Sequence, residues 1–274
     1  MAFFEEYTLE DTTYFGAIHA IEDWQDVLTY YRQLTNQVAP QKILFILDDI
    51  SQCEYTSMHA SHSEALHFDD ADYFIIDGKD VTAEQEEIIY NQIMPLRIAH
   101  YQQQLLKAEN QKDIIDIKQK TKFYNDEDYR AILAMNDCPL PMLDIDNNSA
   151  PSTETTDEII EKRVVLVKQA KVSEHSLKIA LMPNGYFQSD FNIFENYFLI
   201  ASLNKFGYEF MGIGASWLYF IKNDSCSIAG LKVCEFLQQV YGYTVEQTKA
   251  LINMINDNNY LILPYSESPS EYFS

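Results

Sequence analysis

The chain has 274 residues, of which 47% are hydrophobic and 14% aromatic, enough for a packed core and too many for a disordered protein. Its formal net charge is −23, from 42 acidic and 19 basic residues. This charge argues against nucleic acid or an anionic membrane as a partner, because phosphates are bound by clustered Lys and Arg.

The first elements are a helix and two short strands. Residues 22–38 predict a helix, with Trp24, Val27, Leu28, Tyr31 and Leu34 near helical spacing. Pro40 ends it, and the apolar run 42–47 predicts a buried strand. The run 73–76 predicts a second strand, which Asp77-Gly78 closes as a turn.

A long helix follows. Thr82 and Gln85 have the spacing of a capping box, and we expect the helix to continue to about residue 111. Pro95 predicts a kink or a division within it, since proline lacks an N–H and clashes with the preceding turn. Residues 125–137 predict a further helix. The stretch 138–158 is rich in Pro, Ser, Thr, Asn and acids, which is typical of a linker or long loop.

The second part of the chain is more regular. We expect a helix from a Ser189 cap to about Phe206, closed by Gly207. A second helix ends at Gly242, and Thr244 with Gln247 caps a third. The remaining predicted elements are strands over 163–170, 177–182, 208–213, 217–221 and 260–265.

These elements predict an α+β protein with mostly antiparallel sheets and helices on one face. From residue 177 onward, the order resembles a split β-α-β arrangement with one extra helix. The expected organisation is an acidic domain over 1–137, the linker over 138–158, a second domain over 159–266 and a flexible tail over 267–274.

The N-terminal stretch MAFFEEYTLEDTT has acids where a secretory signal has Lys or Arg, and no apolar segment is long enough to span a membrane. The cysteines form no CxxC pair and predict free thiols; they are Cys53, Cys138, Cys226 and Cys234. We therefore expect a cytoplasmic protein. No motif predicts a bound cofactor.

One polar stretch, SMHASHSEALHFDDAD at residues 57–72, holds three of the six histidines. His59, His62, His67 and Asp69 could converge on a divalent ion from a loop, although the spacing of HExxH and similar motifs is absent. We interpret the stretch as a solvated loop. A cluster of histidines among acids could also make a pH-sensitive surface.

Asp48 and Asp49 follow the predicted strand 42–47, a place where α/β enzymes hold magnesium. The simpler interpretation is two acids entering solvent from a buried strand. Gly212 and Gly214 complete neither a dinucleotide-binding fingerprint nor a nucleophile elbow, and strand-and-turn packing explains them better.

Residues 163–266 resemble the four-two-five-three family of domains of unknown function. The similar features are a strand before Pro183-Asn184-Gly185, a helix closed by Phe206-Gly207-Tyr208, paired strands, a helix ending at a Tyr-Gly step and an aromatic last strand. Such domains accompany bacterial toxins, often as immunity proteins. The resemblance therefore implies a protein-binding role and supplies no catalytic residue.

The placement of charge agrees with this role. Residues 1–158 hold 31 acids and 10 bases, and residues 48–87 hold 12 acids and the single base Lys79. We expect an immunity protein, not an enzyme, that occludes a basic toxin or effector, such as a nuclease or a type VI secreted protein, after electrostatic attraction. The predicted partner-binding residues are Asp48, Asp49, Asp69, Asp70, Asp72, Glu84, Glu86 and Glu87.

Two alternatives stay open. One is a metal-dependent enzyme that uses Asp48, Asp49 and the cluster from His59 to Asp72. The other is an acidic structural or regulatory scaffold.

Overall fold

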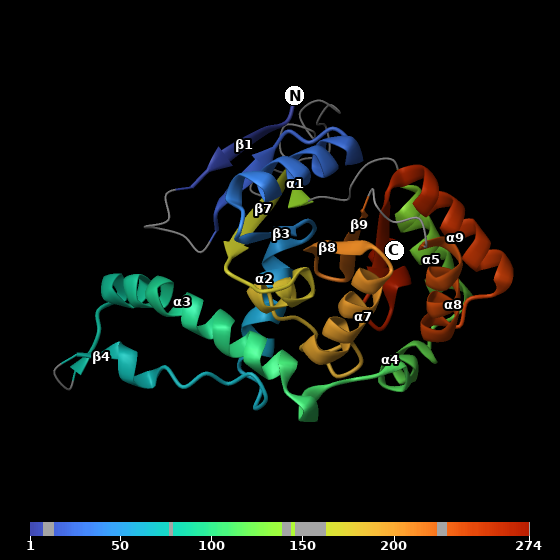
Figure 1. The fold of residues 1–274 in the computed structure, drawn as a ribbon. Helices are drawn as coiled ribbons and strands as arrows, with labels where there is room; N and C mark the ends of the chain where they lie inside the picture. Colours follow the sequence, from blue (N-terminus) through green and yellow to red (C-terminus); the bar gives the residue numbers. More distant parts are fainter. Residues whose placement is uncertain (8–13, 77–78, 139–143, 146–162, 224–228, 274) are drawn as a thin grey trace.

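The computed structural model describes residues 1–7, 14–76, 79–138, 144–145, 163–223 and 229–273 (Figure 1). Its main sheet has the order β1-β2-β7-β3-β8-β9-β10, and β6 pairs with the start of β7. Adjacent strands are antiparallel, except that β3 and β8 are parallel. The strands are β1 (Phe3–Glu6), β2 (Gly16–His19), β3 (Lys42–Ile46), β6 (Asp144–Ile145), β7 (Arg163–Ala170), β8 (Tyr208–Ile213), β9 (Trp217–Lys222) and β10 (Tyr260–Pro264), with the separate pair β4 (Ile75–Ile76) and β5 (Lys79–Asp80).

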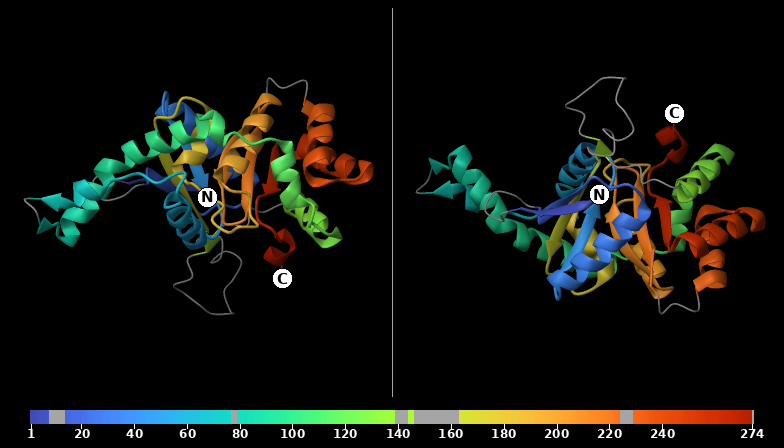
Figure 2. Two further views of the ribbon diagram at one scale, coloured as in Figure 1. Left: turned by 90° about the horizontal axis from the view of Figure 1, so that it is seen from below. Right: turned by 90° about the horizontal axis from the view of Figure 1, so that it is seen from above.

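Helices surround this sheet (Figure 2). The α-helices are α1 (Trp24–Val38), α2 (Ile50–Ser61), α3 (Ala83–Leu106), α4 (Ile114–Thr121), α5 (Asp126–Asp137), α7 (Ile193–Lys205), α8 (Ala229–Tyr241) and α9 (Val245–Asn258). Short 3₁₀ helices are η1 (Ala71–Phe74), η2 (Ala108–Asn110), η3 (His175–Leu181) and η4 (Pro269–Phe273). The fold class is α+β with a mostly antiparallel sheet, as the sequence predicts.

Both sequence halves build the same sheet. β3, from the first half, lies between β7 and β8 from the second half and is hydrogen-bonded to both. One hydrophobic core joins the halves, and the Trp24 ring of α1 packs against the Tyr260 ring of β10 with centroids 4.5 Å apart. The two predicted domains therefore share one sheet and one core. Most of the predicted linker lies outside the described residues.

The central strands have both faces covered. Every residue of β10 is buried, as is every residue of β3 after Lys42. Burial of consecutive residues means burial on both faces, because successive strand side chains point in opposite directions. The sheet thus differs in this detail from the predicted arrangement with helices on one face.

Local sequence signals place most helices. α1 buries Trp24, Val27, Leu28, Tyr31 and Leu34, the five residues of its predicted stripe. The capping boxes of Thr82 with Gln85 and Thr244 with Gln247 form as predicted. Gly207 and Gly242 have positive φ beyond the ends of α7 and α8, a conformation that glycine adopts without strain. α3 continues through Pro95 without dividing.

Two local predictions are wrong and a third is half right. Residues 177–182 fall largely in η3, so the split β-α-β arrangement lacks its first strand. α7 is capped by Asn192, whose side chain accepts hydrogen bonds from the N–H groups of Phe194 and Glu195, and not by Ser189. The strand predicted over 73–76 is half right: Tyr73 and Phe74 lie in η1, whereas Ile75 and Ile76 form β4 and pair with β5.

The C-terminal segment is packed against the body instead of forming a loose tail. The Ser270 hydroxyl donates to Asp128 Oδ1 at 2.7 Å, and the Glu267 N–H donates to Asp190 Oδ1 at 3.0 Å. η4 also contacts α5. Two buried carboxylates thus anchor a segment whose polar composition resembles that of a disordered end.

One part of the chain extends away from the body. The first part of α3, with η1 and the β4–β5 pair, projects outward (Figures 1 and 2). We call residues 67–76 and 79–92 the arm. No residue of the arm is buried among those whose side-chain exposure is described, and Ile93 is the first buried residue of α3. The arm therefore has little packing of its own.

Candidate functional site

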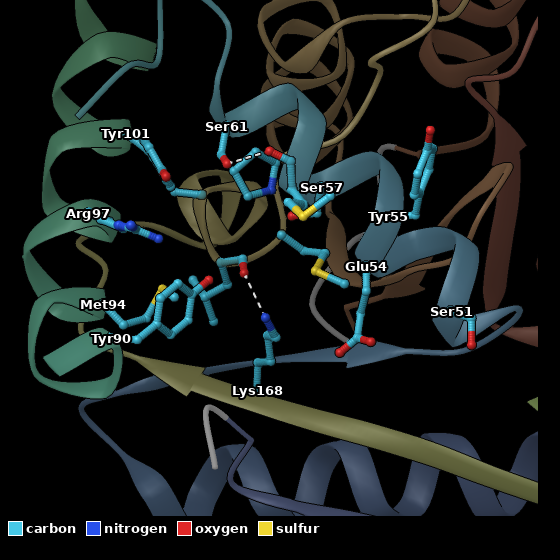
Figure 3. Close-up of a pocket in the computed structure, with 15 residues that line it drawn as sticks. Ser51, Glu54, Tyr55, Ser57, Ser61, Tyr90, Met94, Arg97, Tyr101 and Lys168 are labelled. Atoms are coloured by element: carbon cyan, nitrogen blue, oxygen red, sulfur yellow. Dashed lines mark hydrogen bonds between the residues drawn. The ribbon is translucent and has the colours of Figure 1, made fainter. Parts of the chain in front are cut away.

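A cleft of about 500 Å³ lies between α2 and α3, at the base of the arm (Figure 3). α2 forms one wall, α3 the other, and β7 with residues 180–183 forms the floor. Its volume is in the range of small-molecule sites in proteins. The wall of α2 contributes Ser51, Glu54, Tyr55, Ser57, Met58 and Ser61.

The floor of the cleft holds a cation. Lys168 rises from β7 toward the space between the two helices (Figure 3). Its Nζ donates to the Leu181 carbonyl at 3.5 Å and lies 4.8 Å from the centre of the Tyr14 ring. Burial lowers the pKa of Lys168, and the nearby Glu54 carboxylate partly opposes this shift.

Glu54 provides the opposite charge on the α2 wall. Its Oε1 accepts a hydrogen bond from the Tyr14 hydroxyl at 2.6 Å. Burial, reinforced by this hydrogen bond, raises the pKa of Tyr14, which therefore stays protonated and holds the carboxylate in place. Glu54 and Lys168 influence each other electrostatically but form no ion pair within 4.0 Å.

The wall of α3 carries Arg97, Tyr90 and Tyr101, which extend toward α2 (Figure 3). Arg97 donates through Nε to Asp70 Oδ2 at 2.9 Å and also through Nη2. Its guanidinium lies 4.7 Å from the centre of the Tyr90 ring. This largely buried ion pair fixes the segment before η1 to α3 and holds the base of the arm.

The cleft was not predicted from the sequence. Its charged groups come from elements far apart in the chain, Glu54 on α2, Arg97 on α3 and Lys168 on β7. The one sequence signal was Lys168 itself, a charged residue inside the strand pattern RVVLVKQA. A charge at such a position needs an explanation, because even partial burial of an unpaired cation is costly.

Asp48, predicted to bind a partner, is 1% exposed, so that role at the surface is wrong for this residue. Its Oδ1 accepts from the Ala215 N–H at 2.9 Å and its Oδ2 from the Tyr219 hydroxyl. A Cβ at Gly214 would overlap this carboxylate, so glycine is required there. Asp48 thus connects the end of β3 to the β8–β9 turn.

Asp49 is exposed and begins α2. Its side chain accepts from the Gln52 N–H at 3.1 Å, and its φ of 33° lies in the left-handed region that Asp tolerates. α2 runs through Ser61 and includes His59. The stretch 57–72, which we predicted to be a loop, therefore begins inside a helix. Asp48 and Asp49 point to different surroundings and form no common site.

The three histidines of this stretch also separate. The His59 ring packs between Tyr55 and Tyr186, at 4.4 and 4.7 Å. The His62 ring contacts the Met58 carbonyl of its own helix, whereas His67 lies in the following loop and is exposed. Within the described ranges, no group of three His, Cys, Asp or Glu side chains is placed to hold a metal ion. The metal site proposed for His59, His62, His67 and Asp69 is not assembled.

The remaining predicted acids lie on the arm. Asp69, Asp72 and Glu86 are exposed, and Asp70 is half-buried against Arg97. Glu84 and Glu87 lie in α3, and their side chains are outside the described set. Large apolar side chains are exposed on the same arm: Tyr73, Ile75, Ile88 and Tyr90. Sequence reasoning found the acids and missed the apolar groups.

A second polar cluster is buried between α1, η3 and β8. The Glu209 carboxylate contacts His175 Nδ1 at 2.6 Å and Lys178 Nζ at 3.5 Å, and accepts from the Tyr31 hydroxyl. Burial alone would raise the pKa of Glu209, but these partners lower it to about 2. Burial lowers the pKa of Lys178 to about 8. This network joins both halves of the chain.

No described helix is long and apolar enough to cross a membrane. Among the described residues, Cys53 and Cys234 are free thiols, and Cys226 lies outside the described residues. Comparisons with protein-family models, with curated proteins and with solved structures each found no match to this chain.

Proposed function

We propose that this chain binds a basic protein through its arm and acts in the cytoplasm as an immunity protein. One observation carries the proposal: an acidic projection exposes Tyr73, Ile75, Ile88 and Tyr90, each between 39% and 54% accessible. The exposed acids of the arm, taken alone, would be explained by a contribution to solubility. Exposed aromatic and aliphatic groups on an unpacked projection are better explained by burial in an interface.

The acids and the apolar groups have different roles in this proposal. Asp69, Asp72 and Glu86 are exposed, so they attract a basic partner over a distance and raise its association rate. The apolar groups are then buried against the partner and slow its dissociation. Occlusion of the toxin's active site by the arm would neutralise it.

The first experiment is a tagged pull-down at low salt from cells that express the chain beside its neighbouring genes, with proteins identified by mass spectrometry. A dominant basic protein that is released by salt gives the partner whose activity is then assayed. Neutralisation of that activity supports the immunity role. Binding without neutralisation would favour the acidic scaffold instead.

Two sets of variants test the arm against the captured partner. The triple variant Asp69→Asn, Asp72→Asn and Glu86→Gln should lower the association rate at low salt about tenfold or more. A control of equal charge change on α5, Asp126→Asn, Glu127→Gln and Asp137→Asn, should change it far less. Ile75→Ser with Ile88→Ser should mainly raise the dissociation rate. Equal effects of both charge variants would show that the arm is not the binding surface, and an association rate independent of salt would show that electrostatic attraction does not guide binding.

A further inference from the structure

The cleft between α2 and α3 contains two opposite charges that do not neutralise each other. Among the described residues, Lys168 Nζ has one hydrogen bond, the 3.5 Å contact with the Leu181 carbonyl. An ammonium group has three donors. Glu54 accepts from Tyr14 and leaves its second carboxylate oxygen without a hydrogen bond to any described residue.

Lys168 is partly buried, and a partly buried ammonium group with so few acceptors favours an added anion. Arg97 cannot compete for that anion on equal terms, because Asp70 already accepts from its Nε and Nη2. Lys168 is therefore the cation that a ligand would meet at the floor of the cleft. A charge-assisted hydrogen bond in such surroundings is stronger than one in water.

The other groups of the cleft restrict the charge of the ligand. A phosphate dianion would be repelled by Glu54 and by the net charge of −23. A simple cation would be repelled by Lys168. A ligand with one positive and one negative group can pair with both Glu54 and Lys168. Met58, Met94 and Tyr90 provide apolar and aromatic surface near these charges.

We propose that this cleft binds a zwitterionic ligand of the amino-acid class, either a free apolar amino acid or a very short peptide. Lys168 receives its carboxylate, Glu54 receives its ammonium group, and Met58, Met94 and Tyr90 contact its side chain. This site goes beyond the proposed protein-binding role and does not depend on it.

The test is calorimetric titration, with saturation-transfer NMR for weak ligands, of the full chain with L-phenylalanine, L-methionine and the dipeptide of the two. N-acetyl-L-phenylalanine lacks the ammonium charge and L-phenylalaninamide lacks the carboxylate, so each should bind at least about tenfold more weakly than L-phenylalanine. Tighter binding of the dipeptide assigns the site to peptides, and tighter binding of the amino acids assigns it to free amino acids.

Variants assign the two charges. Lys168→Met keeps the length and apolar character of the side chain and should remove the preference for L-phenylalanine over its amide. Glu54→Gln keeps an acceptor for Tyr14 and should remove the preference over the N-acetyl compound. Lys171→Met and Glu64→Gln, both at exposed positions, are the matched controls. Circular dichroism verifies folding, and Glu54→Gln tests the site if Lys168→Met does not fold.

Two results would overturn the proposal. One is the absence of binding by all three zwitterions up to about 10 mM with folded wild-type protein, a limit beyond which site-specific recognition is negligible. The other is binding that neither Lys168→Met nor Glu54→Gln changes relative to its control.

Discussion

Two neighbouring aspartates show how the surroundings of a residue decide its role. We expect Asp48→Asn to lower the free energy of unfolding by about 1–3 kcal/mol, because the buried carboxylate accepts two hydrogen bonds and an amide has one acceptor oxygen. Asp49→Asn should be nearly neutral, because asparagine caps helices and tolerates positive φ equally well. Urea denaturation of both variants is the measurement. Equal losses would contradict the roles assigned here, since each substitution removes one negative charge.

The Glu209 cluster predicts a pH dependence. The folded-state pKa of about 2 lies below the ordinary value of 4.5, so the contribution of Glu209 to stability is fully present above about pH 4.5 and disappears as pH falls through 2. Glu209→Gln should therefore cost on the order of 3 kcal/mol at pH 7, and the difference from wild type should shrink between pH 5 and pH 2.

Denaturant titrations at several pH values test this dependence. Glu174→Gln is the control, because Glu174 lies beside η3 and is exposed. A loss for Glu209→Gln that is constant from pH 7 to pH 3 would mean that the cluster acts by shape and packing alone.

Sequence reasoning at this scale succeeded for local interactions only. Thr82 with Gln85 could be predicted because both partners lie within four residues. Asp48 with Tyr219 and Tyr31 with Glu209 are separated by 171 and 178 positions, and no local pattern indicates such pairs. The cleft could not be predicted for the same reason, because its charged residues lie on three elements that come together only in the folded protein.

At the scale of elements, the same cap motif occurs in two different environments. α9 packs against α5 and α8, whereas the first ten residues of α3 include none that is buried among those described. Thr244→Ala should therefore lower global stability by about 1 kcal/mol. Thr82→Ala should instead increase fraying of the start of α3 and leave global stability almost unchanged.

Hydrogen exchange and thermal unfolding together distinguish these outcomes. For Thr82→Ala, faster amide exchange should be confined to the first turns of α3. An equal fall in the unfolding midpoint for both variants would show that the arm unfolds together with the core.

Element identity was predictable where packing agrees with local pattern, as in α1 and β7. The prediction was wrong at residues 177–182, where an apolar run suggested a strand. Six consecutive residues of this 3₁₀ helix, from Ser176 to Leu181, are buried, so the segment is enclosed on all sides. Its apolar residues therefore follow neither the period of a strand nor that of a helix. Tertiary packing, absent from any short window of sequence, decides such segments.

At the scale of the whole molecule, the strand order interleaves the two halves of the chain in one sheet. β3 pairs with β7 through five residues and with β8 through two, and both partners come from the second half. A fragment of residues 151–274 would expose both edges of β7, one edge of β8 and the apolar surface that β3 covers. A fragment of residues 1–150 would lack β7, the strand that joins β2 to β3.

We therefore expect neither fragment alone to unfold cooperatively, whereas the mixed fragments should recover the circular dichroism spectrum and the thermal transition of the intact chain. The control is the full chain with a protease site inserted near residue 150 and cleaved after folding, which should remain associated because the sheet and not the connection holds it together. A cooperative transition for residues 151–274 alone would contradict this expectation. It would mean that β8, β9 and β10 with α7, α8 and α9 already bury enough apolar surface to fold, and that β3 joins a sheet that is already formed.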